Sequence, residues 1–353
     1  MFGVIILSLL IILVITLVIM KYLGHTSLRS ALDNDTSVRS KKRLIESNIY
    51  KAPPGYFVDT VEVIPDLELR CATWETKNCK GTILIFSGFT EFIEKYYETI
   101  GDLIDLGWAV VAFDWRGQGL SSKLLKEKDK GYIEHFDQYL QDAEAVYHQR
   151  VAHLPKPHNL LGHSMGGHLA FRELQEYPDR FHRAVLSAPM QSISGLPTNL
   201  LSKFSTFFRL LGFGQSYVIG GKDGDKNKGY KRLTSDINRF RKWSSIFKKE
   251  PRLLMGSATW NWTKAASKSM QLSMKREQIQ KIKTPVYVAS AKDDVVVNEE
   301  THERMDDANP LIKIVPYLGA RHEIYTEINL YRNRFLKDID AFFMEQDQSE
   351  IIT

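Results

Sequence analysis

Cysteine is scarce in this chain, which has only Cys71 and Cys79 among its 353 residues. Two lone cysteines are typical of a protein with free thiols in a reducing compartment, although the sequence leaves open whether these two pair. Nowhere are histidines, cysteines and carboxylates clustered at the spacings that hold a metal ion. We therefore expect no metal and no other cofactor.

Positive charge is modest overall, with a formal net charge of +5, but it gathers in one stretch. Residues 222–252 carry a surplus of about seven positive charges. The chain has no nucleic-acid-binding motif and no basic repeat spaced by aromatic residues. We therefore expect no nucleic-acid partner. The basic stretch fits either a solvated surface or a region that attracts anionic lipid head groups.

The most informative motif is Gly-His-Ser-Met-Gly at residues 162–166, which follows a short apolar run. A serine between two glycines at this spacing predicts a nucleophile elbow, a sharp turn from a strand into a helix. Ser164 would take an unfavourable backbone conformation there, at a cost of about 1–3 kcal/mol. Side chains at positions 162 and 166 would collide across so tight a turn. Ser164 is therefore the candidate nucleophile.

A catalytic serine needs a base, and the base needs a carboxylate to orient it. In this arrangement the acid and then the histidine follow the serine along the chain. An apolar β-run at residues 285–289 precedes Asp293 and Asp294, and a second run at residues 312–315 precedes His322. Loops at the carboxyl edge of a parallel sheet would bring His322 and one of the two aspartates to Ser164.

An oxyanion hole is predicted after the apolar run at residues 82–86. Gly88 lets the backbone approach a substrate there, so that the amide of Phe89 can point at the developing oxyanion. The amide of Met165, directly after the candidate nucleophile, is the expected second donor. Each such donor typically contributes about 3–4 kcal/mol of transition-state stabilisation.

Five segments together resemble the α/β-hydrolases of the monoacylglycerol lipase and bacterial inner-membrane lysophospholipase group. They are residues 88–96, 113–122, 161–168, 186–190 and 319–323. In that group the acid is followed by one residue and then by two hydrophobic residues, so the resemblance implies Asp293 as the acid rather than Asp294. It also implies that Trp260 and Trp262 line an acyl pocket, although two close tryptophans equally fit a cap core. One departure is Ser87, where many lipases of the group have histidine.

The alternation of strands and helices over residues 82–189 predicts an α/β fold with a mostly parallel sheet. Between residues 190 and 283 the alternation stops, which indicates a cap inserted between two strands. We therefore expect an α/β-hydrolase core at residues 46–190 and 284–353, with the cap at 191–283. Within the cap, an apolar series at residues 200–211 fits packing on the core as well as contact with a membrane or an acyl chain.

The one long hydrophobic run lies at the N-terminus, where residues 4–20 are aliphatic apart from Ser8 and Thr16. As a helix over residues 2–23 it would be roughly 33 Å long, enough to cross a hydrocarbon core of about 30 Å. No basic residue precedes the run, and no small-residue cleavage site follows it, which favours an anchor at residues 1–23 over a signal peptide. Basic residues follow, so the sequence predicts a single-pass inner-membrane protein with its catalytic domain in the cytoplasm, joined by a flexible linker at 24–45.

These features together predict a membrane-anchored serine hydrolase that cleaves the acyl ester of a lipid with one fatty chain, a lysophospholipid or a monoacylglycerol. Ser164 would attack the ester carbonyl, His322 would take its proton, and Asp293 would hold the imidazole. A broad carboxylesterase or a lipid acyltransferase on the same residues is the nearer alternative. A catalytically silent, lipid-binding scaffold is the alternative from another class.

Overall fold

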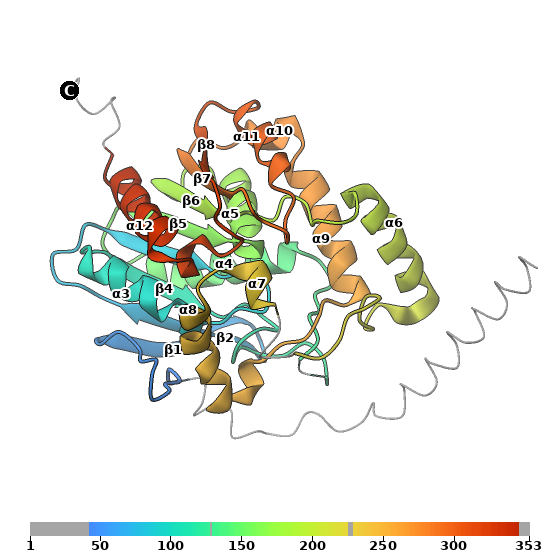
Figure 1. The fold of residues 1–353 in the computed structure, drawn as a ribbon, viewed down its shortest axis with the longest axis horizontal. Coiled ribbons are helices and arrows are strands. Elements are labelled where there is room, and N and C mark those ends of the chain that lie inside the picture. Colours follow the sequence, from blue (N-terminus) through green and yellow to red (C-terminus); the bar gives the residue numbers. More distant parts are fainter. Residues whose placement is uncertain (1–41, 128, 225–228, 346–353) are drawn as a thin grey trace, which may run out of the picture.

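The computed structural model describes residues 42–127, 129–224 and 229–345, and an eight-stranded sheet forms its centre (Figure 1). The strands lie in the order β1-β2-β4-β3-β5-β6-β7-β8. β1 (Tyr56–Ile64) and β2 (Leu67–Trp74) form an antiparallel hairpin, and β2 also runs antiparallel to β4. The other neighbours are parallel. They are β3 (Thr82–Phe86), β4 (Ala109–Phe113), β5 (His158–His163), β6 (Arg183–Ser187), β7 (Val286–Ala291) and β8 (Ile312–Tyr317). The predicted α/β-hydrolase fold with a mostly parallel sheet is confirmed.

Helices cover both faces of this sheet. α3 (Tyr97–Asp105) and α12 (Asn329–Met344) pack on one face, and α4 (Asp137–Val146) and α5 (Met165–Glu176) pack on the other. After Thr82, the residues of β3 are all apolar. Leu84 and Phe86 point into one core while Ile83 and Ile85 point into the other. Strands that are covered on both faces lack the polar alternation of a half-exposed strand.

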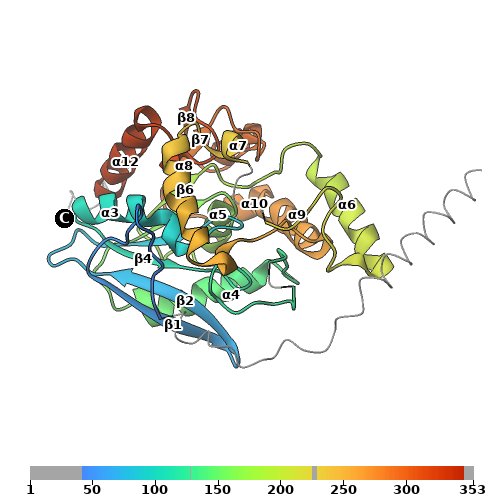
Figure 2. The same cartoon turned by 60° about the horizontal axis from the view of Figure 1, so that its bottom comes forward.

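Between β6 and β7 the chain leaves the sheet and, in its described part, forms helices and loops. These helices are α6 (Thr198–Phe208), α7 (Tyr230–Leu233), α8 (Ile237–Ser244), α9 (Trp260–Ser273) and α10 (Arg276–Ile279), and α11 (Glu303–Asp306) follows β7. α6 packs against the outer side of α9, away from the sheet (Figure 1 and Figure 2). This is the region interpreted from the sequence as a cap, and its boundaries at 191 and 283 stay a prediction.

The N-terminal predictions need correction. The proposed anchor at residues 1–23 and most of the linker lie outside the described residues. Within the described ranges no helix is long and apolar enough to cross a membrane. The longest of them, α12, has 16 residues and is about 24 Å long, shorter than a hydrocarbon core of about 30 Å. We therefore correct the predicted single-pass inner-membrane location, which no described helix supports.

The predicted linker also extends too far along the chain. Its last two residues, Leu44 and Ile45, are buried in the core that contains α3 and α12. The amide of Ile45 donates a hydrogen bond of 3.0 Å to the Glu94 carboxylate. Packed residues with buried hydrogen bonds belong to the folded domain, which therefore begins before residue 46.

The question left open for the two cysteines is answered by the structure, in which Cys71 and Cys79 are both free thiols.

Candidate active site

The turn between β5 and α5 consists of one residue, Ser164. Its φ of 54° lies in the left-handed region, which residues other than glycine rarely adopt. A Cβ atom on Gly162 would lie 2.6 Å from the carbonyl oxygen of Gly166. One on Gly166 would lie 2.1 Å from the carbonyl oxygen of Phe86 in the neighbouring strand. The glycines are therefore required by the turn that presents Ser164 at the edge of the sheet.

Three side chains from separate loops form a hydrogen-bonded chain at this edge. Ser164 Oγ lies 2.9 Å from Nε2 of His322, and Nδ1 of His322 lies 2.6 Å from Oδ2 of Asp294. All three side chains are buried. With the proton on Nδ1 directed at the carboxylate, Nε2 is left to accept the serine hydroxyl proton. The arrangement can therefore convert Ser164 into a nucleophile.

Asp294 is held as a carboxylate by its surroundings. Burial would raise its pKa, but the hydrogen bond with His322 and two backbone amides lower the pKa below its usual value. Those amides belong to Val296 and Val297 and lie 2.7 and 3.1 Å from Oδ1. One carboxylate oxygen is thus fixed by the backbone while the other orients His322.

The choice of Asp293 as the acid is wrong in this structure. Asp293 is exposed, and its amide donates to the carbonyl of Ala320, so its backbone lies along the loop that carries His322. The side chain of the next residue, Asp294, is instead buried and contacts His322. The two hydrophobic residues after the acid that pack on the core are Val296, which is partly buried, and Val297, which is buried, because Val295 is 51% exposed. The sequence pattern was therefore matched one residue too early, and it fits Asp294.

The predicted oxyanion donors, Phe89 and Met165, come from two different segments near Ser164. Met165 is the first residue of α5, and Phe89 lies in the loop after β3. The backbone amides on either side of Phe89 already donate hydrogen bonds to side chains of the protein. Gly88 donates to Glu91, and Thr90 donates to Gln118. Among the described residues no acceptor takes the Phe89 amide. Its role as a donor to substrate stays a prediction, as does that of the Met165 amide.

A cavity of about 530 Å³ opens over Ser164 and His322. This volume lies in the range that holds a small ligand. Much of its wall is apolar, and the polar residues Lys222, Asp223 and Arg232 also line it. The apolar wall includes Phe89, Met190, Ile193, Phe240, Trp243, Phe247 and Trp262.

The two tryptophans proposed for the pocket separate in the structure. Trp262 lines the cavity and packs on Phe89, with ring centroids 4.4 Å apart. Trp260 is not among the lining residues and instead stacks on Phe208 of α6 at 4.2 Å. Both lie in the first turn of α9, where residues two apart face away from each other. The expectation that Trp260 lines the pocket is therefore wrong.

A buried set of charges next to the site was missed in the sequence. Nζ of Lys95 lies 2.7 Å from Glu91 and 2.7 Å from Glu323, the residue after His322. Glu91 also accepts from the Gly88 amide, so Lys95 joins the loop of Phe89 to the loop of His322. Burial would raise the pKa of Glu91, but Lys95 and other donors lower it to about 2. The only sign of these charges in the sequence is the spacing of Glu91 and Lys95, four residues apart. Pairs with that spacing are usually exposed on the surface of a helix.

Replacing Lys95 with methionine is expected to lower the free energy of unfolding by about 3–5 kcal/mol, because two buried carboxylates lose their cation. The measurement is urea unfolding of both proteins at neutral pH. The stabilisation from Glu91 is present above its unfolded pKa of about 4.3 and lost as the pH falls towards about 2, so the difference should shrink in acid.

The matched control for this variant is Lys51→Met, which removes an exposed lysine 3.1 Å from Glu46. Exposed pairs contribute little, so its unfolding free energy should change by less than about 1 kcal/mol. Equal effects of the two substitutions would contradict a special role for the buried set.

Two histidines near Ser164 are held neutral. Burial lowers the pKa of His163 and of His168 to about 3 each. His163 Nδ1 lies 3.1 Å from the carbonyl of Ser187, and His168 contacts Gln191 and Ser269. Neither therefore adds positive charge beside His322. Within the described residues, no cluster of three or more histidines, cysteines and carboxylates could hold a metal ion.

The sheet order and the position of Ser164 after β5 define an α/β-hydrolase. The chain belongs to the Hydrolase_4 family, described as serine aminopeptidase, S33, whose model matches residues 77–329. The resemblance drawn from the sequence motifs is thereby confirmed.

Two bacterial relatives have names of lysophospholipases. The chain is 27% identical to a probable lysophospholipase L2 of Haemophilus influenzae over 75% of this chain and 84% of that protein. It is 26% identical to lysophospholipase L2 of Escherichia coli over 79% of this chain and 85% of that protein. Among solved structures, a soluble variant of monoglyceride lipase from Saccharomyces cerevisiae in complex with a substrate analog aligns with a TM-score of 0.66 at 17% identity. That alignment covers 84% of this chain and 99% of the yeast chain and shows the shared fold. The prediction that the protein is a carboxylic ester hydrolase is confirmed.

Proposed function

We propose that the protein hydrolyses the acyl ester of a lipid with one fatty chain, a lysophospholipid or a monoacylglycerol. The observation that carries this proposal is the hydrogen-bonded chain from Ser164 through His322 to Asp294, which opens into a largely apolar cavity. The names of the bacterial relatives point to the same class of substrate.

In the proposed reaction Ser164 Oγ attacks the ester carbonyl while Nε2 of His322 takes the hydroxyl proton. The amides of Phe89 and Met165 stabilise the oxyanion, and Asp294 stabilises the imidazolium. His322 then returns the proton to the departing alcohol oxygen. This leaves the acyl group on Ser164, and a water molecule, activated by the same imidazole, releases the fatty acid.

A single-chain lipid suits the cavity because its acyl part is apolar and its ester lies next to a polar head. Trp262 and Phe89 form an apolar contact beside the predicted oxyanion donor. Arg232 lines the same cavity and carries positive charge. Apolar surface for a chain and charge for a head group are thus available in one site.

The test is a comparison of substrates offered to the purified protein in mixed micelles. Lysophosphatidylethanolamine, lysophosphatidylcholine, lysophosphatidylglycerol and monoolein are assayed side by side for fatty-acid release, with Ser164→Ala as the blank. We expect release from at least one lysophospholipid and from monoolein. Release from short water-soluble esters alone would contradict the proposal and favour a general carboxylesterase. Added glycerol that captures the acyl group would reveal an acyltransferase.

A further inference from the structure

The short helix α7 lies against both loops that complete the candidate active site. The carbonyl of Leu233 accepts a hydrogen bond of 2.8 Å from the amide of Glu323, next to His322. Arg321 donates to the carbonyl of Thr234 at 3.0 Å. Nη2 of Arg232 donates to the carbonyl of Val295, next to Asp294, at 3.2 Å. Arg232 is thus held beside the histidine loop and the acid loop at once.

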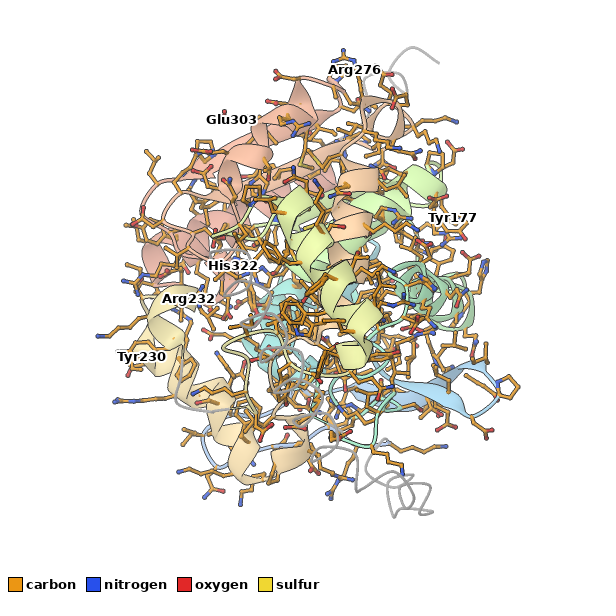
Figure 3. The ribbon with its side chains drawn as sticks, turned by 90° about the vertical axis from the view of Figure 1, so that its right-hand side faces the viewer. Tyr177, Tyr230, Arg232, Arg276, Glu303 and His322 are labelled. Carbon is orange, nitrogen blue, oxygen red and sulfur yellow. The ribbon has the colours of Figure 1, made fainter. Side chains whose placement is uncertain are left out.

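Arg232 and His322 line the same cavity, and both are labelled in Figure 3. His322 has to return its proton to the alcohol oxygen that leaves. That oxygen must therefore lie at Nε2 of His322, and the head group bonded to it continues into the part of the cavity on the histidine side. Because α7 packs on the histidine loop, Arg232 borders the space that the head group enters.

The chemistry of Arg232 suits an anion. Its guanidinium is exposed and carries five N–H donors, of which the Val295 carbonyl takes one at Nη2. Guanidinium groups bind phosphate through paired charge-assisted hydrogen bonds. Among the described residues, three carboxylates line the cavity, and each has a partner. Asp223 accepts from the hydroxyl of Tyr217 at 2.9 Å, and Glu91 and Glu323 are both paired with Lys95.

We propose that Arg232 binds the phosphate of a lysophospholipid head group and so selects phosphorylated single-chain lipids over uncharged monoacylglycerols. The inference rests on the proposed function and adds to it the chemical class of the head group. In a lysophospholipid the glycerol backbone separates the scissile ester from the phosphate. The phosphate can therefore reach the rim of the cavity while the ester lies at Ser164.

The experiment compares kcat/KM for lysophosphatidylglycerol and for monoolein, both in uncharged detergent micelles. Arg232→Gln is expected to lower the ratio of the two values by about tenfold, since the positive charge and its paired hydrogen bonds to the phosphate are lost. Lys231→Gln is the matched control, because Lys231 is the preceding residue of α7, is exposed and does not line the cavity. The control should keep the wild-type ratio.

Each outcome has a distinct meaning. A ratio that is unchanged in Arg232→Gln, or that falls equally in Lys231→Gln, would overturn the role of Arg232. Activity on monoolein in the same preparation reports that the variant is folded. A wild-type protein that releases fatty acid from neither lipid would instead contradict the proposed function.

Discussion

Replacing Ser164 with alanine should lower kcat by about a million-fold, because the hydroxyl that accepts the acyl group is removed. Stability should change little, since alanine is smaller and the strained turn is kept. Fatty-acid release from monoolein gives the rate, and urea unfolding reports the fold. A variant that keeps more than a few per cent of the activity in a clean preparation would reject Ser164 as the nucleophile.

The control for this variant is Ser187→Ala. Ser187 is buried at the end of the neighbouring strand β6, and its hydroxyl has no hydrogen-bond partner among the described residues. Removing that hydroxyl therefore tests whether the loss of any buried serine hydroxyl near the elbow lowers kcat. We expect its kcat to stay close to that of the wild type.

Replacing Asp294 with asparagine should lower kcat by about ten-thousand-fold. An amide presents an N–H to His322 in place of a carboxylate oxygen, which favours the imidazole tautomer with its proton on Nε2. Nε2 then cannot accept the proton of Ser164. The measurement is again fatty-acid release, with saturating substrate so that the loss is read in kcat.

Asp293→Asn provides the matched comparison, because it makes the same chemical change one residue away on an exposed side chain. We expect its kcat to remain near the wild-type value. The reverse order, with Asp293→Asn inactive and Asp294→Asn active, would show that the acid inferred from the sequence pattern is correct after all.

The elbow was predictable because its cause is local. Ser164 can be presented only by a strained turn, and that turn excludes side chains at positions 162 and 166. The residues that the turn requires are therefore close together in the sequence. The mostly parallel sheet was predictable for a similar reason. Strands covered on both faces are apolar along most of their length, as β3 is after Thr82.

The acid and the tryptophans were less predictable because they depend on direction as well as spacing. Three valines follow Asp294, and only their burial shows which two form the hydrophobic pair. Trp260 and Trp262 are equally apolar, but one turn of helix directs them to different neighbours. The first error is a shift of one residue, and the second is a choice between two faces of a helix.

The buried charges could not be recognised from the sequence. Glu91 and Lys95 have the spacing of an ordinary surface pair, and their third partner, Glu323, lies more than two hundred residues further along the chain. Burial of such a set depends on tertiary packing from distant segments, which no local pattern reports. Leu44 and Ile45 are a similar case, since the core that buries them is built from later parts of the chain.

The most direct test of the account is the site at which a fluorophosphonate probe reacts. The intact protein is labelled, digested and examined by mass spectrometry, with and without excess lysophosphatidylglycerol and in the His322→Ala variant. We expect one adduct, on the peptide that contains Ser164, with less labelling when lipid is present and almost none without His322. An adduct on another residue, or equal labelling of Ser164 in the variant, would contradict it.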